Sequence, residues 1–178
     1  MGKKTVIGIV VVIFIVVITV AVYFSVVSSK KKTTPLPARS LHKVLTVIDG
    51  DTIVVDIDGR EETVRLIGVD SPEIVDSSKP VQCFAKESSD FATNILTGKN
   101  IYLEPDSTQA DRDKFNRLLR YVFLEDDTNF NLLLIKEGCG REYTYKGQIY
   151  KYRDEFTAAE KEAKSNLLGL WSCGIAVN

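Results

Sequence analysis

The 178-residue sequence predicts an α+β protein, in which a five-stranded β-barrel with three helices follows one N-terminal transmembrane helix. Three patterns support this prediction. A long uncharged stretch at the amino terminus is typical of a membrane span. Short β-branched runs separated by turn residues indicate a meander of strands, and later segments repeat apolar residues with helical spacing.

The uncharged stretch runs from Thr5 to Ser29, and as a helix it would be about 37 Å long, against a hydrocarbon core of roughly 30 Å. Between Val6 and Val27, 17 of 22 residues are Val, Ile or Phe, which favours the bilayer by about 5 to 10 kcal/mol. We assign residues 1–29 to a transmembrane signal-anchor segment. The apolar run is longer than a typical signal-peptide core, which favours an uncleaved anchor; cleavage near Val26-Val27-Ser28 is the alternative.

Residues 30–40 form a basic, proline-containing linker that begins with Lys30-Lys31-Lys32. Counting positive charges on the two flanks of the apolar segment places the domain in the cytoplasm, because the carboxyl flank is the more basic one. The chemistry of the domain, described below, argues for the opposite orientation.

Charge is distributed unevenly along the chain. Residues 1–39 carry six basic residues and no acidic one, whereas from Ser40 onward 17 basic residues face 24 acidic ones, a net charge of −7. Such a domain is a poor general polyanion binder, because phosphate affinity comes from many Lys and Arg contacts. A nucleic-acid substrate would therefore be bound by a local site and a bound cation.

Cysteine and histidine exclude some chemistries. Cys83, Cys139 and Cys173 are far apart and His42 is the single histidine, so neither a zinc site nor histidine-based nuclease chemistry is expected. An odd number of cysteines allows at most one internal disulfide, and the sequence does not indicate which pair would form it.

Five strands are indicated by alternating or β-branched runs bounded by turn residues. They cover residues 42–48, 52–57, 61–69, 101–103 and 118–124. Asp58-Gly59 is a strong signal for a two-residue hairpin, which makes the second and third strands antiparallel.

Three helices are expected. In the first, Phe84, Ser88, Phe91 and Ile95 lie along one stripe and Gly98 ends the helix. The second covers residues 129–137 and the third residues 153–165, after which residues 169–171 are expected to dock the carboxyl terminus. Five short strands with appended helices fit a Greek-key barrel of the OB type.

Carboxylates and arginines gather at the ends of these strands. Because the hairpin is antiparallel, Asp51 before the second strand lies beside Asp70 after the third, and such a pair can hold a hard cation with backbone oxygen and water. Glu73 is placed to activate water, and Arg65 and Arg117 to bind phosphate oxygens. This combination suits metal-assisted phosphodiester hydrolysis.

Each of these elements taken alone has an ordinary structural interpretation. Asp-Gly is a common turn, and most arginines solvate a surface; only the combination indicates a site. Residues 125–127 are interpreted as an acidic turn rather than a second metal site. The spacing of Tyr143 and Tyr145 fits core aromatics on one strand face slightly better than a base-stacking platform.

Three motifs closely resemble the staphylococcal nuclease (thermonuclease) family: Ile48-Asp49-Gly50-Asp51-Thr52, the stretch from Arg65 to Glu73, and Asp113-Lys114-Phe115-Asn116-Arg117. The resemblance covers about residues 41–173 and makes residues 41–178 a thermonuclease-like OB-fold domain. It implies a calcium-dependent, micrococcal-nuclease-type endonuclease that acts on DNA and RNA. Cleavage of the 5′ oxygen–phosphorus bond would leave 3′-phosphate ends.

The same resemblance implies roles for acidic residues. Asp51, Asp70 and the backbone carbonyl of Ser71 would bind Ca²⁺, with Asp49 in the outer shell, and Glu73 would be the general base. Ser71 stands where the family often has Thr, a change that a carbonyl ligand tolerates.

For the substrate, the resemblance implies that Arg65 and Arg117 bind phosphate and stabilise the transition state. Lys114 would approach a phosphate and Tyr143 would line the nucleotide pocket. Phe115 replaces a frequent Tyr, so a phenol hydrogen bond would be lost while stacking remains. Asn116, at a turn position often held by Gly, is the best other residue for a positive φ.

Three functions are considered. The first is a membrane-attached nuclease, the second a catalytically silent nucleic-acid or peptide-binding module on the same barrel, and the third a structural membrane protein. Retention of all the carboxylates and arginines named above favours the enzyme.

A nuclease in the cytosol would damage the cell's own nucleic acids, and weak calcium sites fill best outside cells. We therefore expect a single-pass cell-membrane protein with an extracellular domain, or a secreted one if the segment is cleaved. The domain is expected to act as a monomer without an obligate protein partner.

Overall fold

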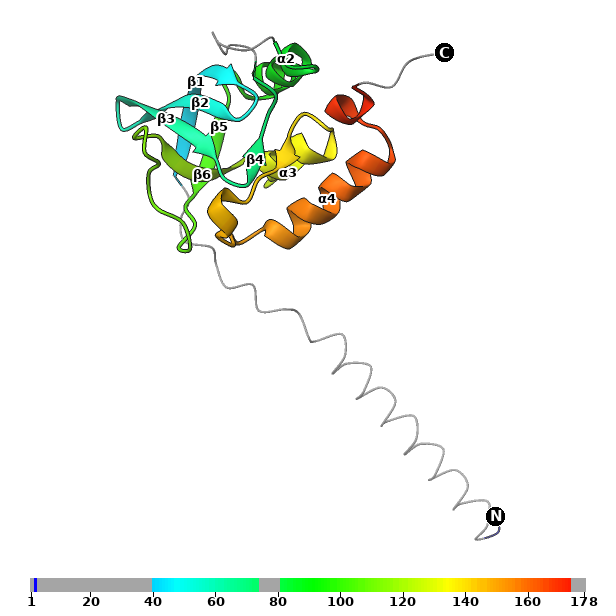
Figure 1. The fold of residues 1–178 in the computed structure, drawn as a ribbon. Helices are drawn as coiled ribbons and strands as arrows, with labels where there is room; N and C mark the ends of the chain where they lie inside the picture. Colours follow the sequence, from blue (N-terminus) through cyan, green and yellow to red (C-terminus); the bar gives the residue numbers. More distant parts are fainter. Residues whose placement is uncertain (1, 3–39, 74–80, 174–178) are drawn as a thin grey trace. The chain divides into compact units, whose positions relative to one another are not determined.

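Five strands close into a barrel in the order β1-β2-β3-β6-β5, with β3 and β6 pairing in parallel (Figure 1). The computed structural model describes residues 2, 40–73 and 81–173. The barrel strands are β1 (Leu41–Asp49), β2 (Thr52–Ile57), β3 (Arg60–Leu66), β5 (Asn100–Glu104) and β6 (Leu118–Phe123). The predicted five-stranded barrel is confirmed.

The hairpin between β2 and β3 forms at the predicted turn. Ile57 faces Arg60 across Asp58 and Gly59, whose φ angles of 53° and 78° are those that a two-residue hairpin turn requires. The strands are antiparallel from this turn to the pair Thr52 and Arg65. Residues just beyond that pair are thereby brought to one end of the barrel.

The predicted third strand, 61–69, is wrong at its carboxyl end. β3 ends at Leu66, and a separate strand β4 (Val69–Asp70) pairs with β7 (Arg141–Glu142) in a second, two-stranded sheet. Gly68 lies between them with φ of 76°, and two aromatic rings leave no space for a side chain there. This turn redirects the chain from the barrel toward β7, which the sequence analysis did not predict.

All three predicted helices are present in the described part of the chain: α2 (Ala85–Leu96), α3 (Phe130–Lys136) and α4 (Arg153–Ser165). Asn129 caps α3 by accepting a hydrogen bond from the Leu132 backbone at 3.2 Å, and Gly138 follows with φ of 67°. Short 3₁₀ segments, η1 (Tyr145–Gly147) and η2 (Gly169–Ser172), flank α4. The Leu170 backbone donates to the Gly138 carbonyl at 2.9 Å, so this segment docks as expected.

The buried face of α2 differs from the predicted stripe. The fully buried residues are Ala85, Ser88, Ala92 and Leu96. The predicted aromatic and aliphatic members, Phe84, Phe91 and Ile95, are only half-buried and pack at the margin of the core. The buried face therefore consists of smaller residues than expected, and it lets α2 approach the barrel closely.

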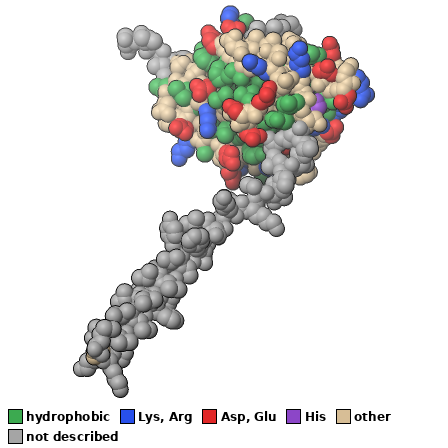
Figure 2. Space-filling view, turned by 180° about the vertical axis from the view of Figure 1, so that it is seen from behind, with side chains coloured by type: hydrophobic (Ala, Val, Ile, Leu, Met, Phe, Trp, Pro, Cys, Tyr) green, Lys and Arg blue, Asp and Glu red, His purple; other side chains and the backbone are tan. Residues whose placement is uncertain are grey.

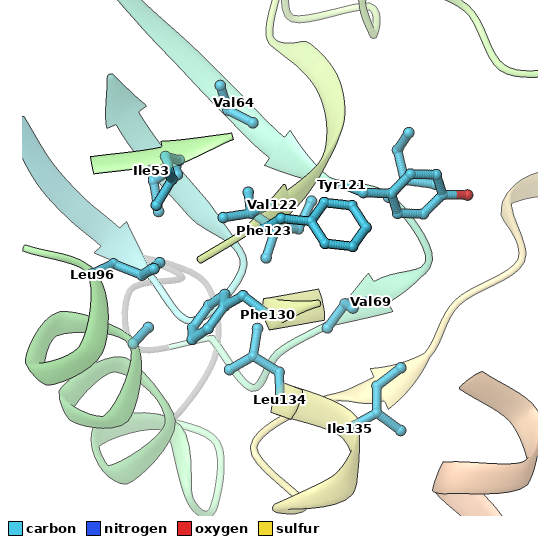
Figure 3. Close-up of a cluster of buried hydrophobic side chains, with 14 of the residues drawn as sticks. Ile53, Val64, Val69, Leu96, Tyr121, Val122, Phe123, Phe130, Leu134 and Ile135 are labelled. Carbon is cyan, nitrogen blue, oxygen red and sulfur yellow. The ribbon is translucent and has the colours of Figure 1, made fainter. Parts of the chain in front are cut away.

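The core lies between the barrel and α3. Figure 3 shows Ile53, Val64, Val122, Phe130 and Leu134 pointing toward one another from four different elements. Each such side chain stabilises the fold by about 1.5 to 3 kcal/mol when fully buried. This packing stabilises the barrel that supports Asp51 and Asp70.

A disulfide joins Cys83 to Cys173 across 90 residues, whereas Cys139 is a buried free thiol. The bridge ties Cys83, two residues before α2 begins, to the residue that follows η2. The sequence allowed one bridge without indicating the pair, and the structure supplies it.

Apart from residue 2, the predicted transmembrane segment (1–29) lies outside the described residues, as does the linker (30–40) except for residue 40. Within the described residues, no helix combines the length and apolarity needed to cross a bilayer. The membrane segment therefore stays a prediction.

We expect Cys83→Ser to lower the free energy of unfolding by roughly 2 to 5 kcal/mol, because the bridge restricts a long loop in the unfolded chain. Urea unfolding of the full chain in detergent measures this loss. Added reductant should lower the free energy of unfolding of the wild type to that of the variant and leave the variant unchanged. An unchanged free energy of unfolding in fully reduced wild type would contradict the expectation.

Asp106 joins three parts of the fold. It is buried and accepts hydrogen bonds from the Tyr121 hydroxyl at 2.7 Å, the Lys151 backbone at 2.8 Å, and both the backbone and hydroxyl of Thr108 at 2.8 Å. Burial by itself would raise the pKa of this carboxyl, but the hydrogen bonds outweigh burial and lower the pKa below 3.8. The charged form is thus the one that the fold stabilises.

Because the folded-state pKa of Asp106 is lowered, its contribution is complete above about pH 4 and is lost as the pH falls through the folded-state pKa. We expect Asp106→Asn to be less stable at pH 7 and to lose less stability on acidification than the wild type. Urea unfolding between about pH 5 and 2 measures both slopes. Equal slopes would show that Asp106 does not carry this dependence.

Candidate active site

The turn between β1 and β2 carries two aspartates of the candidate site, Asp49 and Asp51. Asp49 Oδ1 accepts a hydrogen bond from the Asp51 backbone at 3.0 Å, which closes the turn. Asp51 is 2% exposed; its Oδ1 accepts from the Thr52 hydroxyl at 3.1 Å and its Oδ2 from the Ser71 backbone at 2.7 Å. Asp51 therefore links this turn directly to the segment that follows β4.

Arg65 connects the two predicted metal ligands. One terminal nitrogen, Nη2, lies 3.0 Å from Asp51 Oδ2 and 3.5 Å from Asp70 Oδ1. The other, Nη1, donates to the carbonyls of Leu66 at 2.9 Å and Val69 at 2.6 Å. The structure thus brings Asp51, Arg65 and Asp70 together, as the hairpin argument predicted.

Glu73 shares the electrostatic environment of this cluster. Burial, and then the negative charges of Asp51 and Asp70, raise the pKa of its carboxyl, while Arg65 and Arg117 act in the opposite direction. Its backbone carbonyl accepts from the Gln82 backbone at 3.3 Å. The predicted base therefore lies close to both aspartates and to both arginines.

The turn from Asp113 to Arg117 is built around one carboxylate. Asp113 Oδ1 accepts from the backbones of Phe115 at 2.9 Å and Arg117 at 3.0 Å, and its Oδ2 binds Arg117 Nε at 2.7 Å. Asn116 takes φ of 65°, as expected for its place in the turn. Asp113 thus fixes both the turn and the direction of the Arg117 guanidinium.

A pocket of about 490 Å³ collects these groups. Arg65, Asp70, Glu73, Arg117 and Tyr143 all line it. Lys114 and Phe115 also line the pocket; Phe115 is 67% exposed, with Lys114 Nζ 4.8 Å from its ring centre. Elements that are distant in the sequence therefore contribute cations, a carboxylate base and aromatic surface to one cavity.

Tyr143 and Tyr145 are not core residues. They are 43% and 47% exposed, and their ring centres lie 6.3 Å apart beside the pocket. The Tyr143 backbone donates to the Gly68 carbonyl at 3.1 Å, which places this residue just beyond β7. The interpretation as core aromatics is therefore wrong, because the strand ends at Glu142 before either tyrosine.

Comparison with known proteins places the chain among nucleases. The model of the family described as staphylococcal nuclease homologue matches residues 63–173. The thermonuclease of Staphylococcus hyicus is 43% identical over 131 residues, covering 74% of this chain and 75% of its own, and that of Staphylococcus intermedius is 43% identical over 141 residues, covering 79% and 81%. Endonuclease YncB of Bacillus subtilis is 39% identical over 126 residues, covering 70% and 58%.

The chain belongs to the staphylococcal nuclease family. The family predicted from the motifs, and with it a nuclease enzyme, is confirmed. The matched region includes Arg65, Asp70, Glu73, Arg117 and Tyr143, so the segments that line the pocket lie inside the shared part of the chain.

The acidic groups of this staphylococcal nuclease family member suit a hard cation. Burial and the nearby charge of Asp51 raise the pKa of Asp49 to about 6, and the same two causes raise the pKa of Asp70. Carboxylates that disfavour one another's ionisation are stabilised by a divalent cation, and oxygen donors favour calcium or magnesium.

In the described part of the chain, no three acidic, histidine or cysteine side chains form a metal site by themselves. A cation held by Asp51 and Asp70 would therefore also need oxygens other than side-chain carboxylates. The backbone carbonyl of Ser71, a residue that is itself 3% exposed, and water would supply them. The residues present fit the predicted ligand set.

Sequence reasoning missed several neighbours of the site. Arg141 faces Asp70 across the β4–β7 pair, with Nε 3.9 Å from Asp70 Oδ2. Arg112 lines the pocket and pairs with both oxygens of Glu62 at 2.8 and 3.1 Å. Arg141 lies within a segment covered by the family resemblance, whereas nothing in the local pattern marks Arg112 and Glu62, which are 50 residues apart.

Proposed function

We propose that this protein is a calcium-dependent endonuclease that hydrolyses phosphodiester bonds of DNA and RNA and leaves 3′-phosphate ends. The observation that carries this proposal is the convergence of Arg65, Glu73 and Arg117 on one pocket beside the paired carboxylates of Asp51 and Asp70. Nuclease relatives with 43% identity support the reaction class.

Asp51, Asp70 and the Ser71 carbonyl would hold Ca²⁺, with Asp49 in the outer shell. When bound, the ion would supply positive charge beside a phosphate oxygen. The oxygen-only donor set and the raised pKa values of the neighbouring carboxyls support a hard divalent cation, and the choice of calcium among these follows the family resemblance.

Glu73 acts as the general base. It takes a proton from water as the water oxygen forms a bond to phosphorus, and the bond from phosphorus to the 5′ oxygen breaks. The raised pKa of Glu73 strengthens the carboxylate as a base relative to an ordinary exposed glutamate. Glu73 lines one pocket with Asp70, Arg65 and Arg117, which supports this assignment.

Arg65 and Arg117 bind the phosphate and stabilise the charge that builds on its oxygens during attack. Arg65 is held by two backbone carbonyls and two carboxylates, so its guanidinium is already in place before substrate arrives. Asp113 holds Arg117 through Nε, which leaves the remaining guanidinium donors for the substrate.

Lys114, Phe115 and Tyr143 bind the nucleotide next to the cleaved bond. Exposed aromatic rings stack on bases of either sugar type, which fits cleavage of both DNA and RNA. Lys114 adds a charge near a phosphate. Stacking also explains how Phe115 serves where a Tyr is frequent, since the ring surface is kept.

A catalytically silent binding module on the same barrel is the alternative. A module that binds without cutting has no need of a carboxylate base beside two arginines, and this chain keeps all three facing one pocket. The geometry therefore favours the enzyme.

We further propose that the domain is held at the cell membrane by residues 1–29 and faces outward, or is secreted if that segment is cleaved. The Cys83–Cys173 disulfide supports this orientation, because disulfides persist in oxidising compartments. This argument and the expected supply of calcium oppose the count of flanking positive charges. The enzyme is expected to act as a monomer.

Digestion of single-stranded DNA and RNA by the full chain in detergent, with calcium or with a chelator, tests the activity. We expect cutting with calcium alone, and 3′-phosphate ends by mass spectrometry of the products. Glu73→Gln and Arg117→Ala should each lower turnover at least roughly 10²-fold, because each removes a group that acts in the transition state.

Exposed residues outside the site provide matched controls for these variants. Glu87→Gln and Arg60→Ala make the same chemical changes on the surface and should cut at the wild-type rate. Absence of calcium-dependent cutting by the wild type would refute the enzyme. Cutting by Arg117→Ala at the normal rate would refute only the role of Arg117.

Protease treatment of intact cells tests the orientation. We expect the domain to be degraded on intact cells at the same protease dose as after lysis, because it faces outward. A domain that is protected until the cells are lysed would place it in the cytoplasm.

Thiol labelling tests the disulfide. A reagent that reacts with free thiols should leave Cys83 and Cys173 unlabelled, since they are joined.

A further inference from the structure

We infer that Ser88 of α2 is a positioning residue for the proposed calcium site. Its buried hydroxyl fixes the distance between the turn that carries Asp51 and the segment that carries Asp70 and Ser71. The inference rests on the proposed function, since it takes Asp51, Asp70 and the Ser71 carbonyl as the ligands. Ser88 touches neither substrate nor ion in this scheme; it acts through the segments that carry these ligands.

Ser88 is an unusual member of the buried face of α2. The other fully buried residues of the helix are Ala85, Ala92 and Leu96, whereas Ser88, at 0% exposure, buries a hydroxyl. A buried hydroxyl costs about 1 to 3 kcal/mol unless it is hydrogen-bonded. Alanine would fill the same position with a better helix propensity. The hydroxyl therefore has a specific partner.

That partner is Cys139, which lies two residues before β7, the strand that pairs with Asp70. Ser88 Oγ donates to the Cys139 carbonyl at 2.5 Å, across 51 residues of sequence. The next residue, Gly140, lies against Val69, and Arg141 then pairs with Asp70. Ser88 thus fixes the backbone from which the partner strand of Asp70 begins.

Ser88 also meets the turn that carries Asp51. A Cβ placed on Gly50 would overlap the Ser88 hydroxyl and would lie 2.7 Å from Cβ and 2.8 Å from Oγ of Ser71. Gly50 is therefore packed against both Ser71 and Ser88, with no room for a methyl group on Gly50. The Ser71 backbone in turn donates to Asp51 at 2.7 Å.

The Ser88 side chain is therefore connected to each segment that supplies a proposed ligand. It packs against Gly50, which precedes Asp51 and itself lies against Ser71, and it bonds to Cys139, which leads into the partner strand of Asp70. Loss of the hydroxyl would leave the Cys139 carbonyl without this donor and would open a gap behind Gly50. Both effects loosen the spacing of the ligands without touching Glu73, Arg65 or Arg117.

The test compares Ser88→Ala with Ser89→Ala in the full chain in detergent. Ser89 is the neighbouring, half-buried serine of the same helix, so the control removes an identical hydroxyl. Calorimetric titration with Ca²⁺ alone should show affinity lowered at least about 10-fold for Ser88→Ala and unchanged for Ser89→Ala. At saturating calcium, kcat should remain within about twofold of the wild type, because the base and the arginines are untouched.

A second variant tests the contact itself. Gly50→Ala should weaken calcium binding by pushing a methyl group into Ser88 and Ser71. Its effect should be smaller in the Ser88→Ala background, where the closest clash is gone. Fully additive losses would show that the two residues do not act through this contact.

Four outcomes decide between these possibilities. Weaker calcium binding by Ser88→Ala below its unfolding temperature, with kcat preserved, supports the inference. A lowered unfolding temperature with unchanged calcium affinity would make Ser88 merely structural and overturn it. If the wild type neither binds calcium nor cuts, the proposed function fails; if the wild type does both and Ser88→Ala matches Ser89→Ala, only the role of Ser88 fails.

Discussion

The guanidinium of Arg65 is the interaction on which the site depends. Asp51 is almost fully buried, and a buried carboxylate without a partner costs several kcal/mol. Arg65 supplies the partner at 3.0 Å and also binds the carbonyls of Leu66 and Val69 on either side of the Gly68 turn. The same side chain therefore stabilises the turn and orients Asp51 and Asp70, the proposed metal ligands. Stability and chemistry are coupled at Arg65, whereas the more exposed Arg117, held through Asp113, can be altered separately.

Electrostatics concentrates binding at this pocket. The domain carries a net charge of −7, and the face seen in Figure 2 intersperses acidic and basic side chains with hydrophobic ones rather than presenting a broad basic surface. Long-range attraction of a polyanion is therefore weak, and in the proposed enzyme phosphate affinity would come from a few short contacts. Arg65, Arg117 and Lys114 line one cavity with exposed aromatic rings, so stacking would add to the binding that these few cations provide.

Local sequence signals predicted most of the fold. Asp58-Gly59 specified a hairpin, Asn116 a positive φ, and Asn129 and Gly138 the ends of α3, because each acts on its own backbone within a few residues. The strand break at Gly68 was missed because the apolar residues on both sides, Leu66, Ile67 and Val69, resemble one continuous strand, whereas the turn depends on distant aromatic rings. The face of α2 was assigned to the larger residues, while close approach to the barrel selected the smaller ones.

The candidate site likewise combines residues that local patterns predict with residues that only the fold brings together. Asp51 and Asp70 were placed together because one hairpin relates them. Glu73 and Arg117 were predicted from their residue types and then from the family resemblance, but the pocket that brings them together depends on a long-range fold. Ser88 and Cys139, Cys83 and Cys173, and Glu62 and Arg112 are each separated by at least 50 residues, and no local pattern connects them. A residue such as Ser88 looks like an ordinary helix residue in the sequence. Only its burial against Gly50 and its bond to Cys139 reveal that an otherwise apolar helix face carries one polar contact, and that this contact lies behind the ligands.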